Sequence, residues 1–219
     1  MIKAVLFDMD GVIVNTEPLH RRAYFKMFEE VNIPVTPEYY DQFTGRSTMA
    51  ICENLCEAFN LKQLPNELIQ IKRKHFKRLF DTEGLDLIPG VLDIIKDYHQ
   101  NGLKLVLASS ASMTNIERIF RRFDLDPYFV AKISGADLKA SKPHPEIFLR
   151  AAALADAHTS QCIVIEDSTN GMKAAKAAGI YCIGYQGPTS ENQDYTIADK
   201  VISDFKEIPF QIVSNLIKS

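Results

Sequence analysis

The sequence has no tryptophan, only four cysteines among its 219 residues, and no long hydrophobic run. No run approaches the length of a membrane span, so we expect no membrane partner. The cysteines form no CxxC pair, and the helical spacing of Cys52 and Cys56 has no second pair of ligands nearby. Cys162 and Cys182 lie in apolar, strand-like runs. We therefore expect reduced, largely buried thiols rather than a disulfide framework or a zinc site.

An excess of charge is also lacking, because the formal net charge is only −3. Such a chain has no long-range attraction for nucleic acid or for an anionic membrane, so we expect neither as a partner. The first residues, MIKAVLFDMDG, become acidic too early for a signal peptide, which favours a cytoplasmic protein. Nothing in the sequence requires more than a monomer.

What is abundant is hydrophobic sequence, at 46% of the residues. Residues 4–7 form a continuous apolar run that is typical of a strand buried on both faces. From Pro89 onwards, strand-like runs at 104–109, 130–134, 162–165 and 180–183 alternate with helical patterns. This alternation predicts an α/β fold with a Rossmann-like, doubly wound parallel sheet.

Between the first strand and Pro89 the pattern is all-helical. Thr16 is expected to cap a helix that begins near Pro18, and an apolar stripe that includes Met49 predicts a second helix. The basic residues of segment 72–78, Lys72 and Lys77 among them, are expected on a solvated helix face. We therefore predict a catalytic core of residues 1–15 and 85–219 with an inserted helical cap domain of residues 16–84.

Polar side chains occur where several predicted strands end, or in the loops beside them. They are Asp8, Asp10, Ser109, Ser110, Lys142, Glu166 and Asp167. In open parallel sheets, ligands bind beyond the C-terminal ends of the strands. Each residue also has a structural explanation as a turn, a helix cap or a solvated charge. Ser112 is expected to cap the next helix. Their joint placement at one edge of the sheet favours a common site.

Several carboxylates in one cleft repel each other unless a cation lies among them, and hard oxygen ligands suit Mg²⁺. A magnesium ion and a lysine would together neutralise a phosphate dianion, and serine hydroxyls would complete its oxygen shell. A carboxylate nucleophile could then accept the phosphoryl group, while a second carboxylate handles the proton of the leaving oxygen. The pattern thus indicates Mg²⁺-dependent phosphoryl transfer on a small phosphorylated metabolite.

Four motifs, in order, resemble the haloacid dehalogenase-like phosphatases over essentially the whole chain. They are DMDGVIVNTE at 8–17, LASS at 107–110, SKPHPEIF at 141–148 and IEDSTNG at 165–171. The resemblance is strongest to the β-phosphoglucomutase-like branch. It implies Asp8 as nucleophile and Mg²⁺ ligand, and Asp10 as general acid/base that also offers a backbone carbonyl to the metal. It further implies Asp167 and Glu166 at the metal, and Lys142 with Ser109 or Ser110 at the phosphate.

The presence of Asp10 argues against the dehalogenase members, which lack this acid/base aspartate and act without Mg²⁺. The DxDG motif also argues against the phosphonate-cleaving members, whose first motif differs. In the cap, the resemblance implies substrate roles for His20, Gly45, Arg46 and Lys77. The alternative is that neither side chain has a role in the site. His20 would then be a partly buried helix residue, and Lys77 would be an exposed surface charge.

Two departures separate the sequence from the mutases. Thr48 stands where mutases place an arginine for the distal phosphate, and residues 111–114 lack their Lys-Asn pair. We therefore expect a phosphatase that hydrolyses a sugar phosphate or similar phosphomonoester through an aspartyl-phosphate. A phosphohexomutase of the β-phosphoglucomutase type is the alternative. A catalytically silent module that binds a phosphometabolite is an alternative from another class.

Overall fold

The computed structural model describes residues 1–43, 48–187 and 193–217. The chain divides into two compact units. One, the sheet unit, comprises Met1–Asn15 and Asp86–Ser219, and the other, the helical unit, comprises Thr16–Leu85. No helix among the residues that the structure describes is long and apolar enough to cross a membrane.

In the described part of the chain, the sheet unit is built on a six-stranded, parallel sheet with the strand order β3-β2-β1-β4-β5-β6. The strands are β1 (Ala4–Phe7), β2 (Lys104–Ser109), β3 (Phe129–Ser134), β4 (Cys162–Glu166), β5 (Tyr181–Tyr185) and β6 (Lys200–Ile202). The order reverses direction between β1 and β4, which makes this pair the topological switch point where doubly wound folds bind ligands. The predicted α/β fold class is therefore confirmed.

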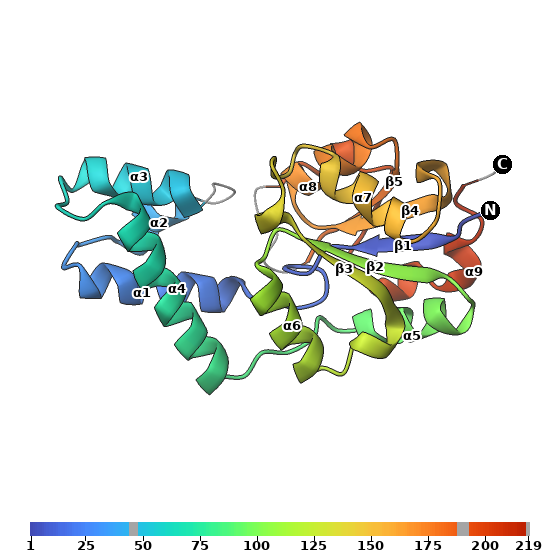
Figure 1. The fold of residues 1–219 in the computed structure, drawn as a ribbon, viewed down its shortest axis with the longest axis horizontal. Coiled ribbons are helices and arrows are strands. Elements are labelled where there is room, and N and C mark those ends of the chain that lie inside the picture. Colours follow the sequence, from blue (N-terminus) through green and yellow to red (C-terminus); the bar gives the residue numbers. More distant parts are fainter. Residues whose placement is uncertain (44–47, 188–192, 218–219) are drawn as a thin grey trace. The chain divides into compact units, whose positions relative to one another are not determined.

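Helices cover both faces of this sheet (Figure 1). They are α5 (Val91–Gln100), α6 (Met113–Arg122), α7 (Glu146–Leu154), α8 (Thr169–Ala177) and the short α9 (Phe210–Val213). Ala4 and Leu6 pack in one buried cluster with apolar residues of α7 and α8. On the other face, Phe7 contacts the rings of Tyr98 and Phe129. Strand β1 is thus buried on both sides, as its continuous apolar sequence predicts.

The helical unit consists of α1 (Glu17–Glu30), α2 (Pro37–Asp41), α3 (Thr48–Ala58) and α4 (Pro65–Thr82) in the part of the chain that is described. Its core gathers buried residues of these helices, Met27 and Leu55 among them. Helix α4 begins with Pro65, and the Glu67 carboxylate accepts the backbone N–H of Leu64 at 2.7 Å. Together with Pro65 at the first helical position, this one-sided cap explains why the helix starts where it does.

Four local expectations were wrong. Thr16 precedes α1, but its backbone is helical rather than extended, so its side chain does not cap the helix. Ser112 precedes α6, where its carbonyl rather than its hydroxyl accepts the first N–H groups. Met49 is 39% exposed, whereas Lys72 is only 6% exposed and lies in the interior of the helical unit rather than on a solvated face. The four cysteines are free thiols, with Cys162 and Cys182 fully buried as predicted.

Candidate active site

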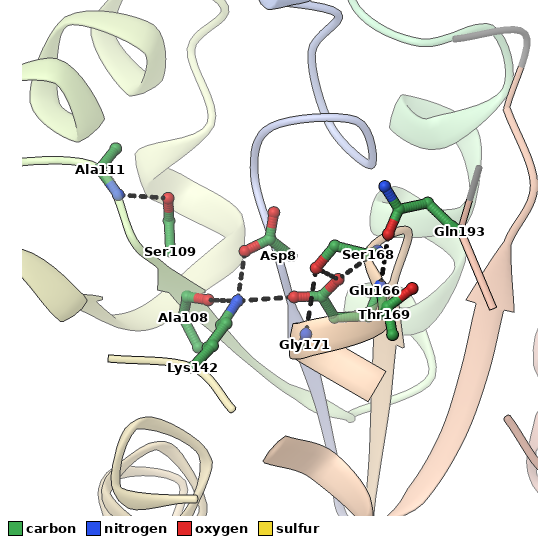
Figure 2. Close-up of polar contacts among 10 residues, drawn as sticks. All are labelled: Asp8, Ala108, Ser109, Ala111, Lys142, Glu166, Ser168, Thr169, Gly171 and Gln193. Atoms are coloured by element: carbon green, nitrogen blue, oxygen red, sulfur yellow. Dashed lines mark hydrogen bonds and ion pairs between the residues drawn. The ribbon is translucent and has the colours of Figure 1, made fainter. Parts of the chain in front are cut away.

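The C-terminal ends of three neighbouring strands bring the predicted polar residues together. Asp8 directly follows β1, Ser109 is the last residue of β2, and Glu166 is the last residue of β4. Lys142 precedes α7 and reaches the same place, between Asp8 and Glu166 (Figure 2). This cluster therefore lies at the switch point between β1 and β4.

Lys142 is the cation at the centre of the cluster. Its Nζ atom lies 2.5 Å from Asp8 Oδ1 and 2.7 Å from Glu166 Oε1, and it donates to the carbonyl oxygen of Ala108 at 3.0 Å. The side chains of Lys142, Asp8 and Glu166 are 6%, 9% and 1% exposed, respectively. These contacts occupy three donor directions of the ammonium, so the lysine is held rigidly against both carboxylates.

The second oxygen of Glu166 is also held. Oε2 accepts the backbone N–H of Ser168 at 2.8 Å and the Ser168 hydroxyl at 2.9 Å (Figure 2). Ser168 in turn caps α8, because its hydroxyl oxygen accepts the N–H of Gly171 at 3.1 Å. Glu166 therefore links the lysine to the start of α8, and its carboxylate has little freedom to rotate.

The loop after Asp8 packs closely against Asp167. Gly11 has a positive φ of 85°, and a Cβ atom there would lie 2.0 Å from Asp167 Oδ2. Only glycine allows both this backbone conformation and this close approach. The carbonyl of Met9 accepts the N–H groups of Ile13 and Val14, which closes the loop into a compact turn. Asp167 is thereby placed against the same loop that carries Asp8 and Asp10.

The cluster combines deep burial with more carboxylates than cations. Burial is the largest cause that raises the pKa of Asp8 to about 7, and Glu166 and Asp10 add to it while Lys142 opposes it. Burial, followed by Glu166 and Asp8, raises the pKa of Asp167 well above its usual range. Burial lowers the pKa of Lys142. The negative charges of Asp8 and Glu166 outweigh this effect, so the pKa lies above the ordinary value for lysine. The lysine stays charged, yet it does not balance all the carboxylates.

This donor set fits a hard divalent cation in type and in charge. The residues offer carboxylate oxygens that repel each other, which is the environment that Mg²⁺ neutralises. Across residues 1–43, 48–187 and 193–217, however, no three histidine, cysteine, aspartate or glutamate side chains are arranged to hold a metal ion. Lys142 bridges Asp8 and Glu166 through one oxygen of each carboxylate.

The two candidate phosphate serines differ sharply in environment. Ser109 is fully buried, and its Oγ atom accepts the backbone N–H of Ala111 at 3.0 Å. Ser110 is exposed. The structure thus places the Ser109 hydroxyl within a folded turn beside the cluster (Figure 2), whereas Ser110 is an exposed residue.

In the helical unit, the structure pairs His20 with a lysine that the sequence reasoning missed. His20 Nδ1 lies 2.8 Å from the Nζ atom of Lys72, while Lys77 is exposed on α4. The His20 ring stacks on Phe76, with 4.3 Å between ring centroids. Lys72 shares the apolar stripe of Leu68 and Phe76, and this periodicity was the available signal. Gly45 and Arg46 lie outside the described residues.

Comparisons with known proteins identify the family of this chain. Residues 5–185 match the sequence profile of a family described as haloacid dehalogenase-like hydrolase. A phosphorylated carbohydrates phosphatase of Thermotoga maritima is 34% identical over 179 residues, which cover 82% of each chain. A beta-phosphoglucomutase of Bacillus subtilis is 29% identical over 218 residues, which cover 97% of this chain and 94% of that protein.

The crystal structure of CbbY from Rhodobacter sphaeroides, in complex with phosphate, superposes with a TM-score of 0.81 at 28% identity. It covers 94% of this chain and 96% of the CbbY chain. A longer relative, SUPPRESSOR OF QUENCHING 1 of Arabidopsis thaliana, is 33% identical over 87% of this chain, which spans 18% of that protein. The chain is therefore an enzyme of the haloacid dehalogenase-like hydrolase family, with β-phosphoglucomutase-like phosphatases and mutases among its relatives.

Proposed function

We propose that this enzyme is a magnesium-dependent phosphatase that hydrolyses a small phosphomonoester, in particular a sugar phosphate. The observation that carries the proposal is the buried contact of Lys142 with Asp8 and Glu166 at the switch point of the sheet. A nucleophilic carboxylate beside a fixed ammonium can meet a phosphate dianion that it would otherwise repel. The phosphatase named among the relatives acts on phosphorylated carbohydrates, which supports the substrate class.

The proposed reaction has two steps. An Asp8 carboxylate oxygen attacks phosphorus, the bond from phosphorus to the ester oxygen breaks, and Asp10 gives that oxygen a proton. Water then attacks the aspartyl-phosphate while Asp10 takes its proton, and inorganic phosphate and Asp8 are released. Lys142 offsets the charge of Asp8 and of the phosphate oxygens in both steps. The Ser109 hydroxyl donates to a phosphate oxygen, because its bond with Ala111 uses an oxygen lone pair and not its hydrogen.

We assign the Mg²⁺ ligands to Asp8, Asp167 and the Asp10 backbone carbonyl, with Glu166 in support. When bound, the ion supplies positive charge that keeps these carboxylates ionised and polarises the phosphate. We further propose that the helical unit is a cap that closes over the substrate and excludes water. His20 and Lys72 belong to this cap, together with the predicted Gly45, Arg46 and Lys77.

The first experiment is a phosphate-release assay over a panel of phosphomonoesters, with and without Mg²⁺. Wild-type protein should release phosphate only with the metal, and Asp8→Asn should release none. Asp156→Asn is the matched control, because the Asp156 side chain is 97% exposed and its positive φ of 51° suits asparagine. An Asp8→Asn variant that turns over at the wild-type rate would refute the proposal. Stoichiometric ligand binding without turnover by the wild type would instead support a silent binding module.

Phosphohexomutase activity is the second candidate, favoured by the beta-phosphoglucomutase that aligns over almost the whole chain. A mutase must hold a phosphate at both ends of its intermediate. Thr48 and the 111–114 segment lack the distal contacts that mutases offer, so we rank hydrolysis first. β-Glucose 1-phosphate separates the two, since a mutase converts it to glucose 6-phosphate faster than phosphate appears in solution.

A further inference from the structure

Two buried serines on neighbouring strands hold the same backbone residue. Ser109 ends β2 and Ser134 ends β3, and the two are direct register partners in the parallel ladder. The Oγ atom of Ser109 accepts the N–H of Ala111 at 3.0 Å, and the Ser134 hydroxyl donates to the carbonyl oxygen of Ala111 at 2.8 Å. Ala111 is thus fixed on both sides of its Cα atom.

The residue that follows β3 brings the chain still closer to this turn. Gly135 begins a short 3₁₀ turn, and a Cβ atom there would lie 3.2 Å from Ser110 Cα and 3.3 Å from the Ser109 carbonyl oxygen. Glycine therefore permits the end of β3 to pack directly on the backbone of residues 109–110. The Ser134 bond and the Gly135 contact act on the same turn from the same side.

Strand β3 lies at the edge of the sheet, and among the described strands its partner is β2 alone. Ser134 is nevertheless only 3% exposed, and its hydroxyl reaches across the strand end to the turn after β2. A buried hydroxyl that meets a backbone carbonyl restricts the dihedral angles of that residue. In this turn the restricted residue is the one whose N–H already binds Ser109.

We propose that Ser134 is a positioning residue for phosphate binding, acting through Ala111 on Ser109. By fixing the Ala111 peptide, Ser134 sets the direction of the Ser109 hydroxyl and of the neighbouring N–H groups before the ligand arrives. Preorganised donors bind an anion more tightly than donors that must first be ordered. This inference rests on the proposed phosphatase function, since it assigns Ser109 to the phosphate.

The test compares Ser134→Ala, Ser134→Thr and the control Ser160→Ala, a substitution at an exposed serine before β4. For each variant we would measure kcat and KM for an active phosphomonoester and the inhibition constant of inorganic phosphate. Ser134→Ala should raise KM and the phosphate inhibition constant together, by about three- to tenfold, which corresponds to one hydrogen bond. Ser134→Thr keeps the hydroxyl and is a conservative replacement at a strand position, where β-branched residues are favoured. It should restore both constants.

Thermal unfolding of each variant separates positioning from folding. A merely structural role predicts a loss of active protein with KM and the phosphate constant unchanged, and this result would overturn the inference. If Ser134→Ala does not fold, Gly135→Ala tests the same turn through its contact with Ser109 and Ser110, and it should raise the same two constants. Unchanged constants in a folded Gly135→Ala would also overturn the inference. A wild type without phosphatase activity refutes the proposed function itself, which is a different outcome.

Discussion

In the helical unit, the Nζ atom of Lys72 lies 2.8 Å from Nδ1 of His20. A lysine ammonium has only donors, so Nδ1 accepts and the ring hydrogen of the neutral imidazole is on Nε2. The ammonium also lies 4.9 Å from the ring centroid of Tyr24 and 5.4 Å from that of Phe76. The hydrogen bond with His20 and the faces of these two rings thus help to stabilise the buried charge of Lys72.

Replacing Lys72 by alanine should destabilise the protein by about 2–3 kcal/mol, because it removes a packed side chain and leaves the Nδ1 atom of His20 without this donor. Lys77→Ala, on the exposed side of the same helix, should change stability by no more than about 0.5 kcal/mol. Urea unfolding at neutral pH measures both. Equal effects of the two substitutions would contradict the buried contact.

The same pair predicts a pH dependence. Burial, followed by the positive charge of Lys72, lowers the pKa of His20 well below its ordinary value of 6.5. Below pH 6.5 the unfolded chain therefore binds a proton that the folded chain does not, and stability is lost as the pH falls. Above pH 6.5 the imidazole is neutral in both states and contributes no slope.

Urea unfolding of the wild type and of His20→Gln at pH 7.5 and pH 5 isolates this contribution. The wild type should lose up to about 2 kcal/mol more than the variant over this interval, as one pKa unit corresponds to about 1.4 kcal/mol. The shared carboxylates titrate in both proteins and cancel in the difference. Parallel pH profiles would show that His20 is not held neutral by its surroundings.

The fold could be predicted from the sequence because its signals are local. Residues 4–7 are apolar throughout, and the alternation of strands and helices after Pro89 leaves a parallel sheet as the simplest arrangement. The edge where Asp8, Ser109 and Glu166 meet follows directly, since parallel strands place their C-terminal ends together. Lys142 could be placed near this edge only through its motif.

The features that the sequence did not reveal depend on contacts between residues that are far apart in the chain. Lys72 has the helical spacing of a core residue, but its charge argued for solvent, and its partner His20 lies 52 positions earlier. Ser134 gave no signal, because its role comes from the register of β3 against β2 and from a bond to Ala111. Composition and periodicity do not show which distant residue pairs with a buried charge, and they do not show the register between two strands.

Magnesium should stabilise the folded enzyme, because a ligand that binds only the native state adds to stability by mass action, about 2.7 kcal/mol at 100 times its Kd. Asp167→Asn should lose most of this response. Without metal, however, the same variant should be more stable than the wild type, because burial and neighbouring carboxylates disfavour the charge of Asp167 and raise its pKa.

Thermal unfolding with a chelator and with added Mg²⁺ checks both halves of this prediction. Asp156→Asn is again the control and should respond to the metal as the wild type does. If Asp167→Asn gains as much from Mg²⁺ as the wild type, Asp167 is not a ligand. The two opposite changes in one variant distinguish metal binding from a general loss of folding.

We predict that replacing Gly171, in α8, by alanine destabilises the protein, although alanine has a higher helix propensity than glycine. A Cβ atom there would lie 1.7 Å from Glu166 Oε1 and 2.3 Å from Oε2, so alanine would displace the carboxylate that contacts Lys142. Alanine in a helix interior usually gains about 1 kcal/mol over glycine. Here overpacking and a disrupted buried ion pair should outweigh that gain, with a net loss of at least about 2 kcal/mol.

The control is Gly84→Ala, since a Cβ atom at Gly84 meets nothing within 4 Å and its φ is not positive. This variant should stay within about 0.5 kcal/mol of the wild type in urea unfolding. Gly171→Ala should also release phosphate more slowly, because a displaced Glu166 no longer holds Lys142 against Asp8. A Gly171→Ala protein as stable as the wild type would mean that Glu166 does not pack on α8, and the proposed anchoring of Lys142 would fail with it.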